Sequence, residues 1–243
     1  MDASQLSAKL QLRYISANLE ELCTEARRTK MGHEKFLAEI FSREVEQRRA
    51  NRIERKIRVA HFPHKKYLQG MELEEYDDDI KAQIEELATL DFIERGENVI
   101  CIGNPGRGKT HLAIGLGIAA CLADMRVLFT NVPNLVIELK EAMSRNEITA
   151  YKRRFERYEL VIIDELGYVS FDKQGNEILF NLLSNRNDVG SIIITTNLAF
   201  ERWEEVFKDP NLTAALVDRL AYKAHVLDMS GESYRLKETK MLR

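Results

Sequence analysis

The sequence predicts an α/β fold in which helices flank a parallel sheet. Apolar, strand-like runs alternate with helical runs from residue 98 onward, and such alternation is typical of a parallel sheet. Three of the strand-like runs end in glycine, carboxylate or amide residues, and open parallel sheets bind ligands at the carboxyl ends of their strands. A chain of 243 residues, 44% of them hydrophobic, can form one such domain and an appendage.

Helical periodicity predicts a small N-terminal module. Apolar residues recur at helical intervals over residues 4–23 and again over residues 34–58. Phe62-Pro63 ends the second pattern, because Pro cannot continue a helix and restricts the residue before it. We therefore expect a helical, basic module over residues 1–66.

The second domain is expected over residues 67–243. It opens with a polar, acidic joint, GMELEEYDDD at residues 70–79, which leads into a helix over residues 80–90. Strands and helices then alternate, and the crossovers between parallel strands should be right-handed. Strands are expected at 98–103, 127–131, 160–164, 191–196 and 224–229, and helices at 109–123, 133–144, 174–187 and 212–220.

The octapeptide Gly-Asn-Pro-Gly-Arg-Gly-Lys-Thr at residues 103–110 fits the Walker A phosphate-loop pattern, and it lies between a strand-like and a helical run. Its glycines let backbone N–H groups turn toward an anion, and the following helix adds its positive N-terminal dipole. Lys109 can reach the β- and γ-phosphates, and Thr110 can hold Mg²⁺. The alternative is a Gly-rich turn with a chance Lys-Thr. The candidate nucleotide-binding residues are Gly103, Asn104, Pro105, Gly106, Arg107, Gly108, Lys109, Thr110 and His111.

Two carboxylates end the strand at residues 160–164 in the Walker B pattern. Asp164 is placed to hold the Mg²⁺ of a bound nucleotide together with Thr110. Glu165 is placed to polarise the attacking water as general base. Without the upstream phosphate loop, the same pair would indicate a solvated loop or a helix cap. The sequence thus predicts ATP and Mg²⁺ as ligands and an Mg²⁺-dependent ATPase.

Asn197 follows the strand at residues 191–196. Its amide can lie beside the γ-phosphate and orient the water, or it can cap the next helix. Phe92-Ile93 are candidates for an apolar wall around the adenine, and ordinary core packing explains them equally well.

With these motifs, the chain resembles the IstB/DnaC-type AAA+ ATPases, which are transposition helpers and helicase loaders, over roughly residues 50–238. The GKTHLA and DELGY strings are more specific than a bare Walker pair, and the GESYRLK ending at residues 231–237 favours the IstB helpers. The residues that carry the resemblance are Phe62-Pro63, Lys65-Lys66, 103–113, 162–168, Thr195-Thr196-Asn197, Asp218-Arg219-Leu220 and Ser233-Tyr234-Arg235.

The resemblance implies further roles. Asn197 would be the sensor-1 residue, Arg219 an arginine finger that reaches the γ-phosphate of a neighbouring subunit, and Arg235 a sensor-2-like arginine. A guanidinium suits phosphate oxygens because it is a planar fork of donors. On the residues alone, Arg219 could equally pair with Asp218 or Glu205, and Arg235 could be solvated. Only eight residues follow Arg235, so no C-terminal helical lid is expected.

Charge is distributed unevenly along the chain. The formal net charge is −3, yet residues 1–66 hold 15 Lys and Arg against 9 Asp and Glu, whereas the rest hold 21 against 30. The second N-terminal helix carries most of this excess, which fits contact with a phosphate backbone or docking of a transposase. The DNA-binding candidates on that helix are Arg48, Arg49, Arg52, Arg55, Lys56 and Arg58.

Residues 145–158 interleave basic and aromatic side chains, a mixture that can grip a nucleic acid. An amphipathic helix with Tyr151, Phe155 and Tyr158 inward explains the aromatics better. The cations left outside as DNA-binding candidates are Lys152, Arg153 and Arg154.

The three cysteines, Cys23, Cys101 and Cys121, have no CxxC spacing, which argues against a disulfide or zinc framework and for a reducing cytoplasm. No signal peptide or membrane-spanning run is present in the sequence, so we expect no membrane partner.

Taken with the resemblance, these features predict an ATP-dependent DNA-remodelling ATPase that assists a transposase. ATP and Mg²⁺ would lie between subunits of a homo-oligomer assembled on double-stranded DNA, and hydrolysis would release or reset the assembly. Two alternatives are a replicative helicase loader and a nucleotide-gated adaptor with little turnover.

Overall fold

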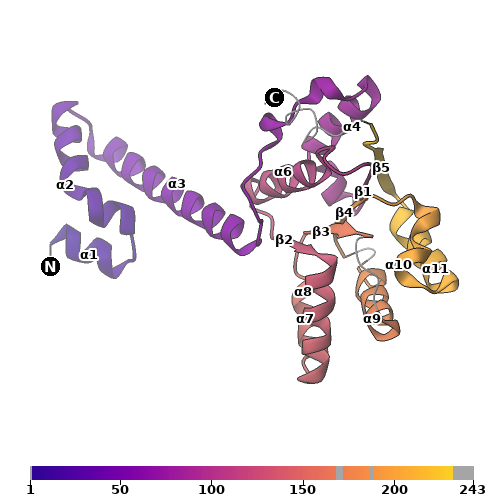
Figure 1. The fold of residues 1–243 in the computed structure, drawn as a ribbon. Helices are drawn as coiled ribbons and strands as arrows, with labels where there is room; N and C mark the ends of the chain where they lie inside the picture. The colour runs from indigo at the N-terminus through magenta and orange to yellow at the C-terminus, as the bar shows by residue number, and fades with distance from the viewer. Residues whose placement is uncertain (1, 168–171, 187–188, 232–243) are drawn as a thin grey trace, which may run out of the picture. The chain divides into compact units, whose positions relative to one another are not determined.

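The computed structural model describes residues 2–167, 172–186 and 189–231, drawn in colour in Figure 1. The chain divides into two compact units, Met1–Arg55 and Lys56–Arg243. This boundary lies ahead of residue 66, because the segment after Lys56 packs on the second unit. Ala60 is fully buried there, and its carbonyl accepts the N–H of Phe129 at 2.8 Å.

Unit 1 contains α1 (Ala3–Lys9), α2 (Arg13–Arg28) and the part of α3 (His33–Val59) up to Arg55. Residues 4–23, where apolar residues recur at helical intervals, are mostly helical but belong to two helices, because the chain breaks between α1 and α2, where Gln11 has a φ of 57°. The helix expected over residues 34–58 is confirmed by α3. The small hydrophobic core of unit 1 consists of Ile15, Leu22 and Ile40.

A buried carboxylate fastens α2 to α3. Glu44, only 3% exposed, accepts the N–H groups of Tyr14 at 2.9 Å and Ile15 at 3.1 Å, which begin α2. Arg48 donates to the same carboxylate at 2.8 Å and to the carbonyl of Gln11 at 2.6 Å. Burial opposes ionisation of Glu44, but these bonds outweigh it and lower its pKa.

Unit 2 is built on a five-stranded sheet in the order β2-β3-β4-β1-β5. Every strand pair is parallel, as the alternation of elements predicts. The three central strands, β3, β4 and β1, are apolar and buried on both faces, and the limits of all five strands match the sequence prediction to within two residues. The strands are β1 (Asn98–Ile102), β2 (Val127–Asn131), β3 (Leu160–Leu166), β4 (Ser191–Thr196) and β5 (Ala224–Asp228).

Helices cover both faces of this sheet. Aspartate or asparagine side chains cap several of their first turns, as at Asp77, Asn131, Asp172 and Asp209. No helix in the described ranges is long and apolar enough to cross a lipid bilayer. The helices are α4 (Asp78–Ala88), α5 (Asp91–Glu94), α6 (Lys109–Leu122), α7 (Val132–Ser144), α8 (Ile148–Phe155), α9 (Lys173–Ser184), α10 (Glu204–Phe207) and α11 (Pro210–Ala221), with short turns η1 (Leu68–Gly70), η2 (Leu73–Glu75) and η3 (Phe200–Arg202).

Alternate residues of each strand belong to two separate cores. Val99 and Cys101 pack with α4 and α6, whereas Ile100 packs with the core formed by α7 to α11. The buried thiol of Cys101 accordingly has a pKa raised to about 12. The two faces of the central strands are therefore both apolar, and the carboxyl ends of the strands are left to bind ligands.

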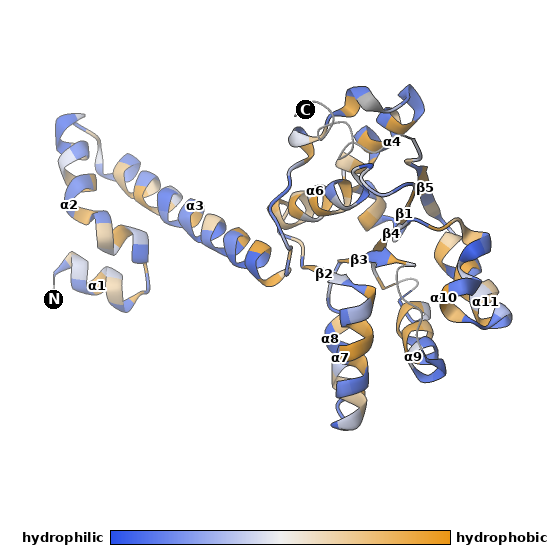
Figure 2. Cartoon of the chain, in the orientation of Figure 1, coloured by the Kyte–Doolittle hydropathy of each residue, from blue (hydrophilic) through white to orange (hydrophobic). Residues whose placement is uncertain are grey.

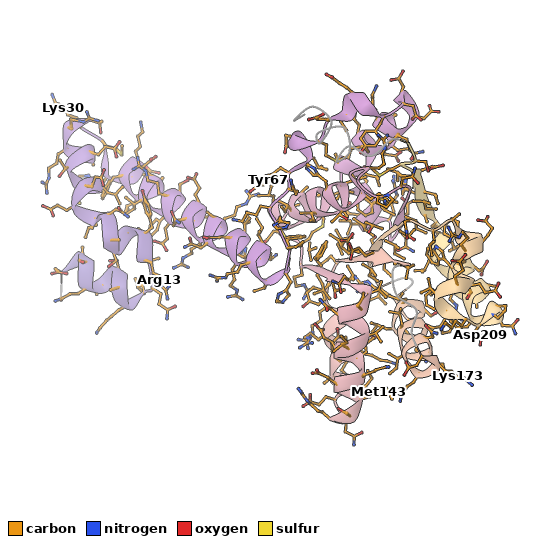
Figure 3. The ribbon with its side chains drawn as sticks, viewed as in Figure 1. Arg13, Lys30, Tyr67, Met143, Lys173 and Asp209 are labelled. Carbon is orange, nitrogen blue, oxygen red and sulfur yellow. The ribbon has the colours of Figure 1, made fainter. Side chains whose placement is uncertain are left out.

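The helix after the glycine loop, α6, is buried over most of its length, and Figure 2 shows that it is mostly hydrophobic. Two glycines let other chain segments cross it closely. A Cβ at Gly115 would lie 2.7 Å from the Leu68 side chain, and one at Gly117 would lie 2.8 Å from Phe62. The irregular segment around Tyr67 therefore lies directly against α6 (Figure 3).

Candidate functional site

The glycine loop between β1 and α6 has the backbone shape of a phosphate cradle. Gly106 and Gly108 have φ values of 82° and 79°, in the left-handed region that glycine adopts without strain. Gly108 also serves as the residue before α6, so the helix begins at Lys109. The first N–H groups of α6 lack partners within the helix, which suits them to an anion.

The ammonium of Lys109 lies within this loop. Its Nζ donates to the carbonyls of Gly103 at 2.6 Å and Asn104 at 2.8 Å. Gly103 and Asn104 are not part of the cavity lining, so their contribution to the site is to hold the lysine. The other predicted nucleotide-binding residues, 105–111, all line the cavity.

A hydroxyl and a carboxylate meet beside the loop. Thr110 Oγ1 donates to Asp164 Oδ1 at 2.9 Å, which joins the start of α6 to the end of β3. Asp164 is buried at 6% exposure, and the Thr195 hydroxyl donates to the same Oδ1 at 2.5 Å. Hard oxygen ligands of this kind suit Mg²⁺, so the donor set fits the predicted metal at Thr110 and Asp164.

Glu165 lines the same cavity, one residue after Asp164. Its side chain is exposed and its φ is 64°, a left-handed conformation that costs a residue with a Cβ about 1–2 kcal/mol. Its backbone N–H donates to Thr195 Oγ1 at 3.0 Å. Glu165 and Thr110 therefore line one cavity at the carboxyl ends of β3 and β4, and the buried Asp164 is joined to it by its hydrogen bond with Thr110.

The cavity has a volume of about 510 Å³. One wall is the loop and α6, and the other is the irregular segment 63–76, which includes Pro63, His64, Lys66, Met71 and Tyr76. Sequence reasoning treated part of this segment as a joint and missed its place in the site. The available signal was the pair of glycines within the helix after the loop, since glycine inside a helix marks a close approach by another segment.

A tyrosine and an arginine fasten this wall to the loop. Tyr76 Oη donates to the carbonyl of Arg107 at 2.6 Å, and the Arg107 guanidinium lies 5.0 Å from the centre of the Tyr76 ring. Arg107 is only 7% exposed, and its Nε donates to the carbonyl of Met229 at 3.4 Å. His111 bonds to the carbonyl of Tyr67 at 2.9 Å. These contacts close the wall over the start of α6.

Phe92 and Ile93 are not part of the cavity wall. They are 1% and 8% exposed and pack in the core with α4 and α6. The adenine-wall interpretation is therefore wrong, and core packing explains them.

Asn197 follows β4 but does not line the cavity. Its Oδ1 is buried and accepts no hydrogen bond from the described residues. The capping alternative is wrong, because Ala199 precedes η3.

Arg219, the arginine that the resemblance implies as a finger, does not line the cavity. Arg219 is exposed near the end of α11, with its guanidinium 5.3 Å from the centre of the Phe180 ring. The Glu205 carboxylate, a partner considered for it, binds Arg202 at 2.8 Å. Arg235 lies outside the described residues, as do Tyr168, Ser233 and Tyr234.

The basic candidates on α3 differ in their surroundings. Arg48 binds Glu44, and Lys56 binds Asp124 at 2.6 Å, so both cations already have carboxylate partners. On α8, Tyr151 and Phe155 are buried as expected, and the Arg154 guanidinium covers the Tyr151 ring at 4.9 Å. The basic candidates whose side chains are exposed are Arg48, Arg49, Arg52, Arg55, Arg58, Arg153 and Arg154.

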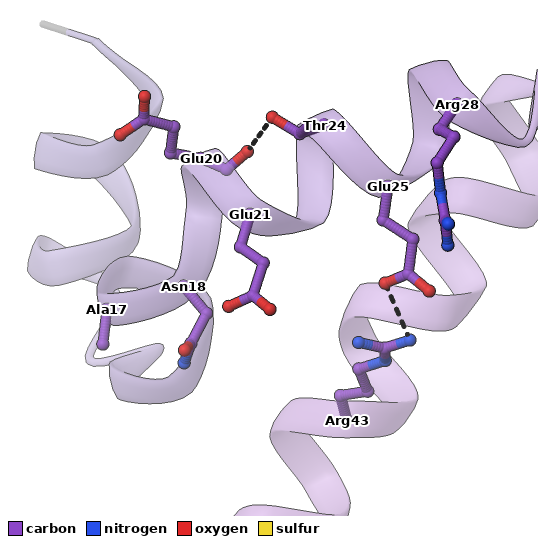
Figure 4. Close-up of a pocket in the computed structure, with 8 residues that line it drawn as sticks. All are labelled: Ala17, Asn18, Glu20, Glu21, Thr24, Glu25, Arg28 and Arg43. Atoms are coloured by element: carbon purple, nitrogen blue, oxygen red, sulfur yellow. Dashed lines mark hydrogen bonds and ion pairs between the residues drawn. The ribbon is translucent and has the colours of Figure 1, made fainter.

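Unit 1 has an open hollow of its own between α2 and α3 (Figure 4). Glu20, Glu21 and Glu25 line it, and Glu25 binds Arg43 at 3.2 Å. Carboxylates repel phosphate oxygens, so this hollow does not resemble the site in unit 2.

The fold and the site together define a P-loop nucleotide-binding protein of the AAA+ type. Solved structures with the same fold include DnaI, with a TM-score of 0.58 and 18% identity over 74% of this chain and 98% of that one. The DnaC helicase loader gives a TM-score of 0.55 and 19% identity over 72% and 98%. At these identities the likeness concerns the fold alone.

The sequence comparison identifies the family. The model of the IstB-like ATP binding proteins matches residues 5–241. An insertion sequence IS21 putative ATP-binding protein of Pseudomonas aeruginosa is 34% identical, covering 97% of this chain and 89% of its own length. The corresponding IS232 protein of Bacillus thuringiensis subsp. berliner is 32% identical over 94% and 92%. The chain belongs to the IstB-like ATP-binding protein family.

Proposed function

We propose that this protein is an Mg²⁺-dependent ATPase that assembles on double-stranded DNA and assists a transposase. The observation that carries the catalytic part is the meeting of three groups at one cavity: the phosphate loop, the Thr110–Asp164 pair and the Glu165 carboxylate. A protein that only bound nucleotide would not need a carboxylate beside the metal-holding pair.

The phosphates of ATP would lie on the loop, where they compete with the Gly103 and Asn104 carbonyls for the Lys109 ammonium. Mg²⁺, held by Thr110 and Asp164, would neutralise charge on the β- and γ-phosphates. Glu165 would accept a proton from the attacking water. Asn197 would orient that water as the sensor-1 residue that the family resemblance implies, although it lies outside the cavity lining in the described structure.

The nucleoside would lie against segment 63–76. Pro63, Met71 and Ile114 give this part of the cavity apolar surface, and Tyr76 adds an aromatic face. His64 and Lys66 lie on the same wall and bring polar and positive groups to its rim. A flat heterocycle with a charged tail suits such a lining.

Turnover would need a second copy of the chain. Arg219 lies outside the cavity lining, so it would act on the γ-phosphate held by a neighbour, as the family resemblance implies. Arg235 would complete the phosphate contacts as a sensor-2-like residue. ATP would favour assembly to the extent that the assembled state binds ATP better than the separate subunits do.

DNA binding would use two sets of exposed cations, Arg49, Arg52, Arg55 and Arg58 on α3 and Arg153 with Arg154 on α8. Arg48, Lys56 and Lys152 would contribute less, because the first two are in ion pairs and the third is half-buried. Contacts with phosphates are independent of base sequence and weaken with salt. The assistance to a transposase rests on the relatives, whose names place them in insertion sequences.

Sedimentation of the full chain tests this proposal. The protein is run with ATP and Mg²⁺, with and without a duplex of several tens of base pairs, and with a single strand of the same length. We expect a large complex that requires ATP and duplex together. Assembly only on single strands would favour a helicase loader instead.

The remaining alternative is an adaptor in which ATP is structural. It predicts ATP-dependent assembly with no release of phosphate. Phosphate release by the wild-type chain, and its loss in Glu165→Gln with ATP binding retained, would exclude the adaptor.

A further inference from the structure

A bulge in β3 brings two consecutive carboxylates to the same site. Ile163 pairs with Ile194, but the next pair is Leu166 with Thr196, so Asp164 and Glu165 lie opposite a single residue of β4, Thr195. Neighbouring residues of a regular strand point to opposite faces of the sheet. The bulge breaks this alternation, so that Asp164 reaches Thr110 while Glu165 lines the cavity.

The single hydroxyl opposite the bulge bonds to both bulged residues. Thr195 Oγ1 accepts the N–H of Glu165 at 3.0 Å, within the interruption of the ladder. The same hydroxyl donates to Asp164 Oδ1 at 2.5 Å. The Thr195 hydroxyl thus donates its one proton to Asp164 and uses a lone pair to accept the backbone N–H of Glu165, the proposed base.

Thr195 is 2% exposed, so water cannot readily replace its hydroxyl. Without it, the part-buried Glu165 N–H would lose this hydrogen bond, and the left-handed φ of Glu165 would lose a polar restraint. The backbone conformation of Glu165 sets the direction of its side chain. The placement of Glu165 at the cavity therefore depends on a hydroxyl on the neighbouring strand.

We propose that Thr195 is a positioning residue for ATP hydrolysis, which holds Asp164 and Glu165 in one geometry through the β3 bulge. The inference rests on the proposed ATPase function and adds a residue that the Walker motifs do not contain. It also explains how two adjacent strand residues can serve the metal and the water at the same time.

The test compares Thr195→Val with Thr195→Ser in the full chain. Valine keeps the shape of the side chain and removes the hydroxyl, whereas serine keeps the hydroxyl and removes the methyl group. We expect Thr195→Val to lower kcat by at least about 10-fold with the KM for ATP changed by less than about 3-fold, because positioning affects the transition state more than ground-state binding. Thr195→Ser should restore kcat to within about 3-fold of the wild type.

Amide hydrogen exchange gives a second readout that does not need turnover. The N–H of Glu165 should exchange faster in Thr195→Val and at the wild-type rate in Thr195→Ser. Thr213→Val is the matched control, since Thr213 is 6% exposed and its hydroxyl donates to the Asp209 carbonyl at 2.7 Å, away from the cavity. It should lower stability without changing kcat or the Glu165 exchange rate.

Glu165→Gln separates this inference from the proposed function. Loss of turnover in Glu165→Gln with near-normal turnover in Thr195→Val would overturn the positioning role and leave the ATPase proposal standing. Unchanged turnover in Glu165→Gln would overturn the proposed base and with it this inference. In the double variant, Thr195→Val should reduce the residual rate of Glu165→Gln by less than about 2-fold, because both changes act on one step.

Discussion

Lys109 shows how far a motif predicts a single residue. The Walker pattern predicts its identity and its reach toward phosphates, but not its partners in the described structure, the carbonyls of Gly103 and Asn104. Thr195 was part of a family string and had no assigned role, because its importance comes from lying opposite a bulge that no local pattern reveals. The role of Phe92 and Ile93 was ambiguous in the sequence, because the apolar wall of an adenine pocket and a hydrophobic core have the same composition.

Lys109→Ala should lower the affinity for ATP by about 10–100-fold, since hydrogen bonds to a charged group contribute about 1.5–3 kcal/mol. The same change leaves the Gly103 and Asn104 carbonyls without this donor, so the loop itself should exchange amide protons faster. Titration with a fluorescent ATP analogue measures the affinity. Lys140→Ala is the control, because Lys140 binds Asp172 at 2.7 Å and is not part of the cavity lining. Equal affinities for the two variants would contradict the role of Lys109.

At the scale of elements, the three central strands of unit 2, β3, β4 and β1, were predictable because each is a short apolar run buried on both faces. The break between α1 and α2 could not be predicted from the sequence, because Leu10 and Leu12 continue the apolar pattern across the turn at Gln11. The wall of the cavity was missed because segment 63–76 has only two short turns and therefore no periodicity.

The contact of α2 with α3 gives a test of unit 1. Glu44→Gln should reduce the stability of unit 1 by about 1.5–3 kcal/mol, because the buried carboxylate accepts hydrogen bonds from two backbone N–H groups and from Arg48. Faster amide exchange at Tyr14 and Ile15 measures the effect. Glu46→Gln, an exposed change on the same helix, is the control and should leave both amides protected.

The acidity of Glu44 sets the pH range of this effect. Its pKa is lowered in the folded chain, so the stabilisation is fully present above the ordinary value of 4.5 and is lost as the pH falls through the lower, folded pKa. Protection of Tyr14 and Ile15 in the wild type should therefore fall below that pH, whereas in Glu44→Gln it should be nearly constant. A wild-type profile as flat as that of the variant would refute the assignment.

For the whole molecule, the division at Arg55 changes how charge is shared. Unit 1 holds 11 Lys and Arg against 9 Asp and Glu, whereas the sequence boundary at residue 66 gave 15 against 9. The difference is made by Lys56, Arg58, Lys65 and Lys66, which belong to unit 2. Sequence reasoning could not place them, because α3 crosses the boundary without a break.

The arrangement of subunits decides the role of Arg219. Arg219→Ala should bind ATP within about 3-fold of the wild type and lose about 1000-fold or more in turnover, the usual contribution of an arginine that reaches a neighbour's phosphate. Mixing it with Glu165→Gln should restore part of the activity, because one variant supplies the base and the other the arginine. Phosphate release measures both effects.

The double variant Glu165→Gln with Arg219→Ala is the control for mixing. It offers neither group, so adding it to Arg219→Ala should restore nothing. If both mixtures are equally inactive while the complexes form, Arg219 does not act across subunits.

Segment 63–76 has a further consequence for the susceptibility of the chain to proteases. Lys65 and Lys66 are exposed, and Lys66 borders the cavity. A protease must draw several residues out of their native contacts to cleave a bond, and here those contacts include the wall on which we place the nucleotide. Bound nucleotide stabilises the closed wall by mass action. Trypsin cleavage after Lys65 and Lys66 should therefore slow as nucleotide is added, so the accumulation of fragments that begin at residues 66 and 67 reports how fully the site is occupied.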